Sequence, residues 1–192
     1  MTSANRLAGY TLADWESLDP LQGHRVELVD GHLVVNAAPA VRHQRVADRL
    51  RTLLDDAVAD DGMEAVTTVG LRVREGLGYI PDIVVSTERV ETTTVDVDLV
   101  ALVVEVVSPS TKKTDRLEKP AALAAAGVPA YWRVELDNTH DAGPTIYCYR
   151  LDGRTYLESA VLHPGTTDTV QVTGTVSITF DPADLHRARP RR

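Results

Sequence analysis

The spacing of hydrophobic and polar positions predicts a domain built from both strands and helices. Residues 25–29 alternate between apolar and polar side chains, which predicts a strand. The Asp30-Gly31 pair predicts a tight turn, and residues 32–36 then form the second strand of a hairpin. From 41 to 58 the apolar residues recur at helical spacing, which predicts a long helix.

The rest of the chain continues this mixture. A capping pattern that starts at Thr11 predicts a short helix. An Ala-rich segment at 120–126, followed by Gly127, predicts another helix, and 87–97 reads as a loop with little regular structure. Further strands are predicted at residues 66–73, 79–85, 98–107 and 131–135. The remainder, at 145–150, 155–161 and 170–180, is predicted to form β hairpins. The fold class is therefore mixed α/β or α+β, with additional β hairpins towards the N- and C-terminal ends.

Length and composition indicate one soluble globular domain over residues 1–192. A chain of 192 residues with 43% hydrophobic and 25% charged residues can bury a sizeable core. We expect the core within residues 10–180 and a disordered, arginine-rich tail at 186–192. No apolar run is long enough for a membrane helix, and a single cysteine, Cys148, fits a cytoplasmic protein.

The net charge of −8 limits the functions that involve nucleic acid. Proteins that coat nucleic acid tightly and without specificity carry a basic surplus, which this chain lacks. A local basic face remains compatible with this charge. Hydrolases with a Gly-x-Ser-x-Gly elbow, phosphate-loop enzymes and Gly-x-Gly-x-x-Gly nucleotide binders are disfavoured, because none of these motifs is present.

One carboxylate stands inside the most apolar strand of the sequence. Glu105 interrupts the run of Val and Leu at 98–107, which is typical of a strand covered on both faces. A buried carboxylate is costly unless it pairs with a cation or binds a metal. Asp82 follows Pro81 at the mouth of another apolar strand, so two acids come from strands of one sheet. Carboxylate pairs of this kind suit Mg²⁺ or Mn²⁺, and the alternative for Glu105 is a structural ion pair.

Several motifs in order resemble the Uma family of restriction endonucleases, within the PD-(D/E)XK nuclease superfamily. The resemblance covers residues 10–180. The segments that carry it are 26–31 (Val-Glu-Leu-Val-Asp-Gly), His43, Pro81-Asp82, 104–111 (Val-Glu-Val-Val-Ser-Pro-Ser-Thr), 115–119 and 126–132 (Ala-Gly-Val-Pro-Ala-Tyr-Trp).

The resemblance implies a fold, an activity and a set of site residues. The implied fold is a restriction-endonuclease-like mixed sheet flanked by helices. The implied activity is metal-dependent hydrolysis of nucleic-acid phosphodiester bonds, with DNA as the expected substrate, Mg²⁺ or Mn²⁺ as cofactor and a homodimer as the expected assembly. The implied catalytic residues are Asp82, Glu105, Lys119 and Glu27, with metal at Asp82, Glu105 and Glu27, and possible phosphate contacts at His43, Lys112 and Lys113.

Two departures from the family pattern keep other functions open. The superfamily lysine would stand two residues after the glutamate, at Val107, so Lys119 on the following helix is expected to replace it. The family helix carries a tyrosine where this chain has Leu123, and Pro120 places Lys119 at the helix start. One alternative is an inactive member of the fold that binds nucleic acid or protein. Another is a structural homodimer whose acids are satisfied internally.

Overall fold

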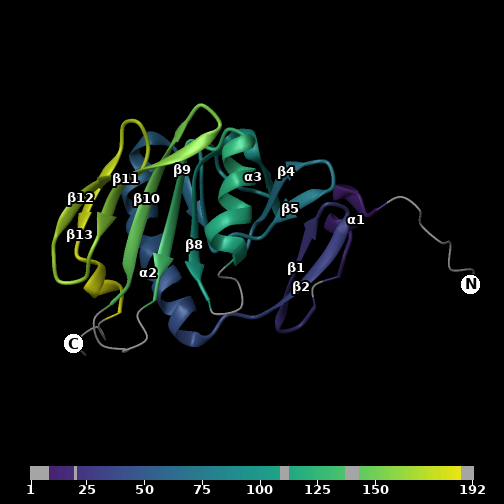
Figure 1. Cartoon of the computed structure of the whole chain (residues 1–192), viewed down its shortest axis with the longest axis horizontal. Coiled ribbons are helices and arrows are strands. Elements are labelled where there is room, and N and C mark those ends of the chain that lie inside the picture. The colour runs from purple at the N-terminus through teal and green to yellow at the C-terminus, as the bar shows by residue number, and fades with distance from the viewer. Residues whose placement is uncertain (1–8, 20, 109–112, 137–142, 187–192) are drawn as a thin grey trace, which may run out of the picture.

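A mixed six-stranded sheet in the order β11-β10-β9-β8-β6-β3 forms the centre of the protein (Figure 1). The structure is a computed structural model that describes residues 9–19, 21–108, 113–136 and 143–186. Strands β8 and β9 run parallel and the other neighbours run antiparallel. The strands are β3 (Glu64–Val66), β6 (Ile83–Ser86), β8 (Val100–Val107), β9 (Ala130–Glu135), β10 (Thr145–Asp152) and β11 (Thr155–Leu162).

A second sheet of five strands carries the N-terminal hairpin. Its order is β2-β1-β5-β4-β7, and β4 and β7 are parallel. Asp30 and Gly31 both have positive φ, 47° and 77°, which confirms the tight turn predicted between β1 and β2. The strands are β1 (His24–Val29), β2 (His32–Ala37), β4 (Gly70–Arg74), β5 (Leu77–Tyr79) and β7 (Thr94–Asp96).

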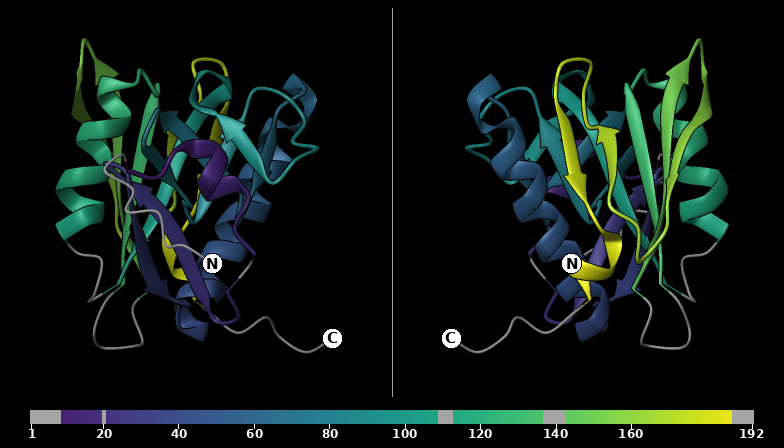
Figure 2. Two further views of the ribbon diagram at one scale, coloured as in Figure 1. Left: turned by 90° about the vertical axis from the view of Figure 1, so that its right-hand side faces the viewer. Right: turned by 90° about the vertical axis from the view of Figure 1, so that its left-hand side faces the viewer.

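Helices cover the six-stranded sheet on both faces, as the two side views in Figure 2 show. Helix α2 and the C-terminal hairpin pack on one face, and α3 and the five-stranded sheet pack on the other. The predicted long helix, 41–58, is confirmed at both ends. The remaining elements are α1 (Leu12–Glu16), α2 (Val41–Val58), α3 (Lys119–Ala125), β12 (Asp168–Gln171), β13 (Ser177–Phe180), η1 (Ala59–Asp61), η2 (Val97–Leu99), η3 (Thr114–Glu118) and η4 (Pro182–Leu185).

Strand β8 is buried along its whole length, as its apolar sequence predicted. Leu102 and Val104 belong to the core on the α2 side, whereas Val103 belongs to the core on the α3 side. Because side chains alternate along a strand, Glu105 shares the face of Val103 and points towards α3. The strand therefore carries its one carboxylate into the space between α3 and the second sheet.

Three sequence predictions need correction. Residues 66–73 do not form one strand, because β3 and β4 belong to different sheets and the chain turns between them, with Thr68 in the left-handed region at φ 58°. Residues 79–85 do not form one strand either, because β5 ends at Tyr79 in the five-stranded sheet and β6 begins at Ile83 in the six-stranded sheet. The predicted loop at 87–97 contains strand β7, which pairs with β4 and gains order from that tertiary contact. These errors arise because strand partners are chosen across the fold, not within a short segment.

Trp15 of α1 packs on the inner strands of the second sheet. Its side chain is buried, and its indole N–H donates a hydrogen bond to the carbonyl of Val26 at 2.6 Å. A Cβ at Gly78 would collide with the Trp15 ring, so this position of β5 requires glycine. The capping box predicted at Thr11 is present and starts α1. Among the described helices, none has the length and apolar character needed to cross a membrane.

Candidate active site

A cavity of about 370 Å³ opens where the two sheets meet the beginning of α3. Hairpin β1–β2 forms one wall, and the ends of β5 and β8, together with η3 and α3, form the other. We call it the acid cavity because five carboxylic acids line it. Its charged and titratable residues are Arg25, Glu27, His43, Asp82, Glu105, Asp115, Glu118 and Lys119.

Asp82 stands directly before β6 and is held by three donors. Its Oδ1 lies 2.6 Å from Nη1 of Arg25. Its Oδ2 lies 3.0 Å from Nε2 of His43 and accepts the backbone N–H of Val106 at 2.8 Å. The last bond ties Asp82 to β8, the strand that carries Glu105. The two acids predicted to act together therefore sit on neighbouring, antiparallel strands, since Ile83 pairs with Val104.

The electrostatic surroundings keep Asp82 ionised. Burial by itself would raise the pKa of this carboxyl, but the hydrogen bond and charge of His43 and the guanidinium of Arg25 outweigh it. The resulting pKa is about 2, below the ordinary 3.8. At neutral pH, Asp82 is a carboxylate available to a cation.

Lys119 lies at the centre of the other carboxylates. Its Nζ is 2.8 Å from Oε1 of Glu105, 3.1 Å from Oε1 of Glu27 and 3.7 Å from Oδ1 of Asp115. The ammonium also lies 5.4 Å from the ring centroid of Tyr79. Lys119 is only 5% exposed, so these contacts replace almost all of its hydration.

The buried lysine and its main partner shift each other's proton equilibria. Burial opposes the charge on Lys119, yet the carboxylates of Glu105, Glu27 and Asp115 raise its pKa above the ordinary value. Burial raises the pKa of Glu105 well above its ordinary value, and only Lys119 counteracts it. Lys119 is therefore a permanent cation, and burial shifts Glu105 towards its protonated form while Lys119 opposes that shift.

Glu27 is held by three donors, from β2, from the segment after β5 and from α3. Its Oε1 accepts the backbone N–H of Ile80 at 2.9 Å, and its Oε2 accepts Nδ2 of Asn36 at 3.0 Å. With Lys119, these donors leave Glu27 buried at 4% exposure. Glu27 therefore faces the interior of the protein, not solvent.

A π-helical turn at η3 brings Lys119 into the cavity from the helix. The backbone N–H of Lys119 bonds to the carbonyl of Thr114, and Pro120 sits in the first turn of α3, where its ring is tolerated. Asp115 and Lys119 share a face, one turn apart, and both are buried. The helix thus supplies the lysine that the strand lacks, since position 107 is a buried valine.

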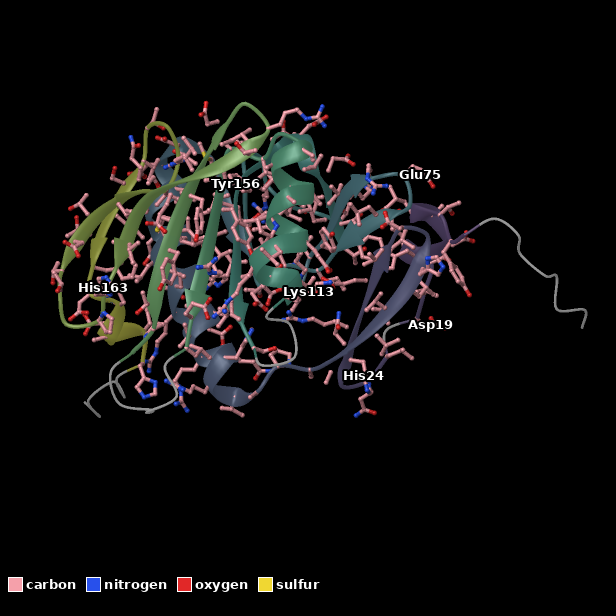
Figure 3. The ribbon with its side chains drawn as sticks, in the orientation of Figure 1. Asp19, His24, Glu75, Lys113, Tyr156 and His163 are labelled. Carbon is pink, nitrogen blue, oxygen red and sulfur yellow. The ribbon has the colours of Figure 1, made fainter. Side chains whose placement is uncertain are left out.

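The remaining predicted residues lie in different places. His43 contacts Asp82 and lines the acid cavity, and its Nδ1 is buried without a hydrogen-bond partner among the described residues. Lys113, which precedes η3 and is labelled in Figure 3, is 80% exposed and pairs with Glu118. Lys112 and residues 187–192 of the predicted tail lie outside the described residues.

The sequence prediction missed three residues of the site. Arg25 binds Asp82, Asn36 binds Glu27, and Asp115 completes the acids around Lys119. For Arg25 a signal existed, because it stands two residues before Glu27 and so shares its strand face. Asn36 lies opposite Arg25 in the hairpin register. For Asp115 the signal was its position one helical turn before Lys119.

The donor set fits a hard divalent cation held by few protein ligands. Across the described residues, no three acidic, histidine or cysteine side chains converge into a ready-made metal site. Mg²⁺ commonly takes one or two protein carboxylates and completes its shell with water and substrate phosphate. Four carboxylates, Glu27, Asp82, Glu105 and Asp115, face two permanent cations, Arg25 and Lys119. The cavity thus has an excess of negative charge when its acids are ionised.

Comparison with known proteins places the chain in a family. The sequence pattern of Uma2, described as "Putative restriction endonuclease", matches residues 12–181. The chain belongs to the Uma2 family. The Uma resemblance predicted from the motifs is thereby confirmed. No protein of curated function matches the chain.

A solved structure shares the fold of this Uma2 protein. It is a crystal structure described as a putative nuclease belonging to DUF820, from Anabaena variabilis, and it aligns with a TM-score of 0.69. The match has 17% sequence identity and covers 92% of this chain and 97% of the other. At this identity the likeness shows the fold, and it confirms the predicted mixed α/β class.

Proposed function

We propose that this Uma2 protein is a divalent-metal-dependent nuclease that hydrolyses phosphodiester bonds of DNA. One observation carries the proposal: Asp82 and Glu105, from neighbouring strands, line a single cavity with a buried lysine 2.8 Å from Glu105. The superfamily that the motifs resemble uses two acids and a lysine, and here α3 supplies the lysine. The family description and the fold of the structural neighbour support the same activity.

Asp82 and Glu105 would hold Mg²⁺ or Mn²⁺, with Glu27, 3.1 Å from Nζ of Lys119, as the additional metal-binding acid. When bound, such a cation polarises a phosphoryl oxygen and lowers the pKa of coordinated water. Asp82 is ionised in advance by Arg25 and His43, so it offers its oxygens without losing a proton. Burial raises the pKa of Glu105, so a bound cation competes with a proton for this carboxyl more than it does at Asp82.

Lys119 and Arg25 are the groups suited to the substrate's charge. Lys119 holds a permanent ammonium inside the cavity, where the surroundings exclude most water and strengthen its attraction for an anionic oxygen. Arg25 is the more accessible cation, with 23% of its side chain exposed, so its guanidinium is placed to meet a phosphate that enters the cavity. His43 orients Asp82, and its predicted phosphate contact stays a prediction.

The first experiment is a calorimetric titration of the protein with Mn²⁺ at several pH values. We expect saturable binding in the wild type, a loss of at least tenfold in affinity for Glu105→Gln, and tighter binding as pH rises, because the metal competes with the proton of Glu105. Glu118→Gln is the matched control, since Glu118 lines the same cavity but pairs with the exposed Lys113. Its affinity should stay near that of the wild type.

Cleavage is tested separately on supercoiled plasmid with Mg²⁺ or Mn²⁺. We expect nicked or linear product with the wild type and none with Asp82→Asn or Lys119→Met. Both variants should be checked for folding by circular dichroism. A folded wild type that binds Mn²⁺ yet leaves both DNA and RNA intact contradicts the proposal.

A binding module without catalysis is the second candidate, and the ion pairs favour it. Glu27, Glu105 and Asp115 are already compensated by Lys119, and Asp82 by Arg25, so the site is satisfied without metal. If the protein is a binding module, the calorimetric titration should detect no heat of Mn²⁺ binding at any pH. Its binding to DNA should not change when a chelator is added. The titration above separates the two candidates.

The predicted homodimer has one structural feature in its favour. Strand β2 is an edge of the five-stranded sheet, and its Val34 and Val35 are exposed. Pairing of two β2 edges would place the two acid cavities near one interface, since Asn36 of β2 touches Glu27. Sedimentation equilibrium of the wild type and Val35→Lys tests this assembly, and a monomeric wild type contradicts it.

A further inference from the structure

A second cavity lies on the opposite side of η3 and α3. Its volume is about 340 Å³, and we call it the arginine–tyrosine groove. Three arginines and three tyrosines line it, together with small residues of α3. Its chemistry-bearing residues are Arg116, Arg133, Arg154, Tyr131, Tyr149 and Tyr156. Figure 3 shows Tyr156 on β11, the strand that packs beside α3.

The charge of the groove is opposite to that of the whole chain. The protein has 28 acidic and 20 basic side chains, yet among the described residues no aspartate or glutamate lines this groove. Glu135, which lies outside the lining, positions two of the arginines: Arg116 Nε is 2.8 Å from its Oε1, and Arg133 Nε is 3.0 Å from the same oxygen. One carboxylate between two guanidiniums leaves an excess of positive charge. The groove is thus the local basic face that the net charge had left open.

The tyrosine rings of the groove pack against one another and against Arg133. Tyr131 and Tyr156 stack with centroids 5.8 Å apart and an interplanar angle of 21°, and Tyr149 lies 6.4 Å from Tyr131. The Arg133 guanidinium covers the rings of Tyr147 and Tyr149 at 4.5 and 5.5 Å. Rings held in this way lose little freedom when a flat group packs on them. Leu117, 64% exposed, adds an apolar edge.

The groove and the acid cavity are lined by different residues of one segment. In η3, Asp115 and Glu118 line the acid cavity, whereas Arg116 and Leu117 line the groove. A chain with a phosphate in the acid cavity would reach the groove by crossing η3. Arginine with aromatic rings is the combination that binds single-stranded nucleic acid, through phosphate and base respectively.

We propose that the arginine–tyrosine groove binds one nucleotide of a single strand next to the bond that is cut. The base packs against Tyr149 and Tyr156, and the phosphate is bound by Arg116 and Arg154. This inference rests on the proposed nuclease function, because it assigns the surface that holds the flanking part of the substrate. Arg154 is exposed in the turn before β11, and the Arg116–Glu135 pair is at the surface, so both guanidiniums remain accessible to a phosphate.

The test measures binding of a short fluorescein-labelled oligothymidylate by anisotropy, in EDTA so that no metal acts. We expect saturable wild-type binding and a Kd about tenfold higher for each of Arg116→Ala and Arg154→Ala. The slope of log Kd against log salt should become shallower by about 0.7 in each, because each variant removes one cation from a phosphate. Tyr149→Leu should weaken binding and leave the salt dependence unchanged, because it removes a ring and no charge. Arg89→Ala is the matched control, an exposed arginine outside both cavities.

Each result supports or overturns the inference. Unchanged Kd and salt dependence in both arginine variants overturn it, as does a wild type that binds duplex DNA but not the single strand, or neither. Arg154 lies in an exposed turn, so its variant tests the groove even if Tyr149→Leu fails to fold. Binding that depends on the groove without cleavage refutes the nuclease and not the groove, whereas cleavage with groove-independent binding refutes the groove alone.

Discussion

The two cavities beside α3 differ in the sign of their charged groups and in how deeply those groups are buried. In the acid cavity, carboxylates outnumber permanent cations, and nearly every charge is buried and paired within the fold. In the arginine–tyrosine groove the cations lie at the surface, and the carboxylate that orients two of them stays outside the lining. Buried charges are expensive to leave unpaired, whereas exposed pairs contribute little to stability. The acid cavity is therefore part of what holds the protein together, and the groove is free to serve a ligand.

Replacing Lys119 with methionine should lower the free energy of unfolding more than any other change considered for the two cavities. The variant leaves the carboxyls of Glu105, Glu27 and Asp115 buried without their shared cation. We expect the free energy of unfolding to fall by about 3–5 kcal/mol, measured by urea denaturation. Lys113→Met is the matched control, an exposed lysine that should change stability by less than about 0.5 kcal/mol. Equal stability of both variants would contradict the structural role of Lys119.

Acid should destabilise the protein through Asp82. Because its folded pKa is about 2 against an ordinary 3.8, its contribution is present above about pH 4 and is lost as pH falls through about 2. The loss amounts to about 2 kcal/mol. In Asp82→Asn the stability between pH 4 and 2 should decline less steeply than in the wild type. Asp152→Asn, at the exposed end of β10, should follow the wild-type profile, and identical slopes in all three proteins would refute the assignment.

Tyr131 joins the two regions, so its hydroxyl tests their connection. It donates a buried hydrogen bond of 2.6 Å to the carbonyl of Asp115, while its ring packs in the groove wall. Tyr131→Phe should lower the free energy of unfolding by about 1–2 kcal/mol and weaken Mn²⁺ binding, because Asp115 and Lys119 lose an anchor. Tyr147→Phe, on the neighbouring strand, should leave the metal affinity unchanged. An effect of Tyr131→Phe on stability alone would mean that the two cavities are not coupled through η3.

The smallest change should come from the groove itself. Arg154→Ala removes an exposed side chain, so its free energy of unfolding should stay within about 0.5 kcal/mol of the wild type. Chemical denaturation beside Arg89→Ala measures it. A fall in the free energy of unfolding of well above about 1 kcal/mol would show that the groove, like the acid cavity, stabilises the fold. The two cavities would then not differ in this respect.

Local patterns in the sequence determined a good part of this protein. The helical spacing at 41–58 matched α2 to the residue, and the Asp30-Gly31 pair predicted the turn between β1 and β2. Glu105 and Asp82 were recognised because an acid in or beside an apolar strand is unusual wherever that strand pairs. These features depend only on short stretches of consecutive residues and on the alternation of apolar and polar positions within them. The sequence alone is therefore enough to predict them.

The tertiary structure alone decided which groups meet. Arg25 reaches Asp82 across 57 residues of sequence, and Lys119 gathers acids from β1, β8 and η3. The groove is formed by residues of η3, β9, β10 and the start of β11, and no sequence motif predicted it. The separation of β3 from β4 was missed for the same reason. Pairing of strands and packing of helices bring distant residues together, and the local periodicity of the chain does not encode the choice of partner.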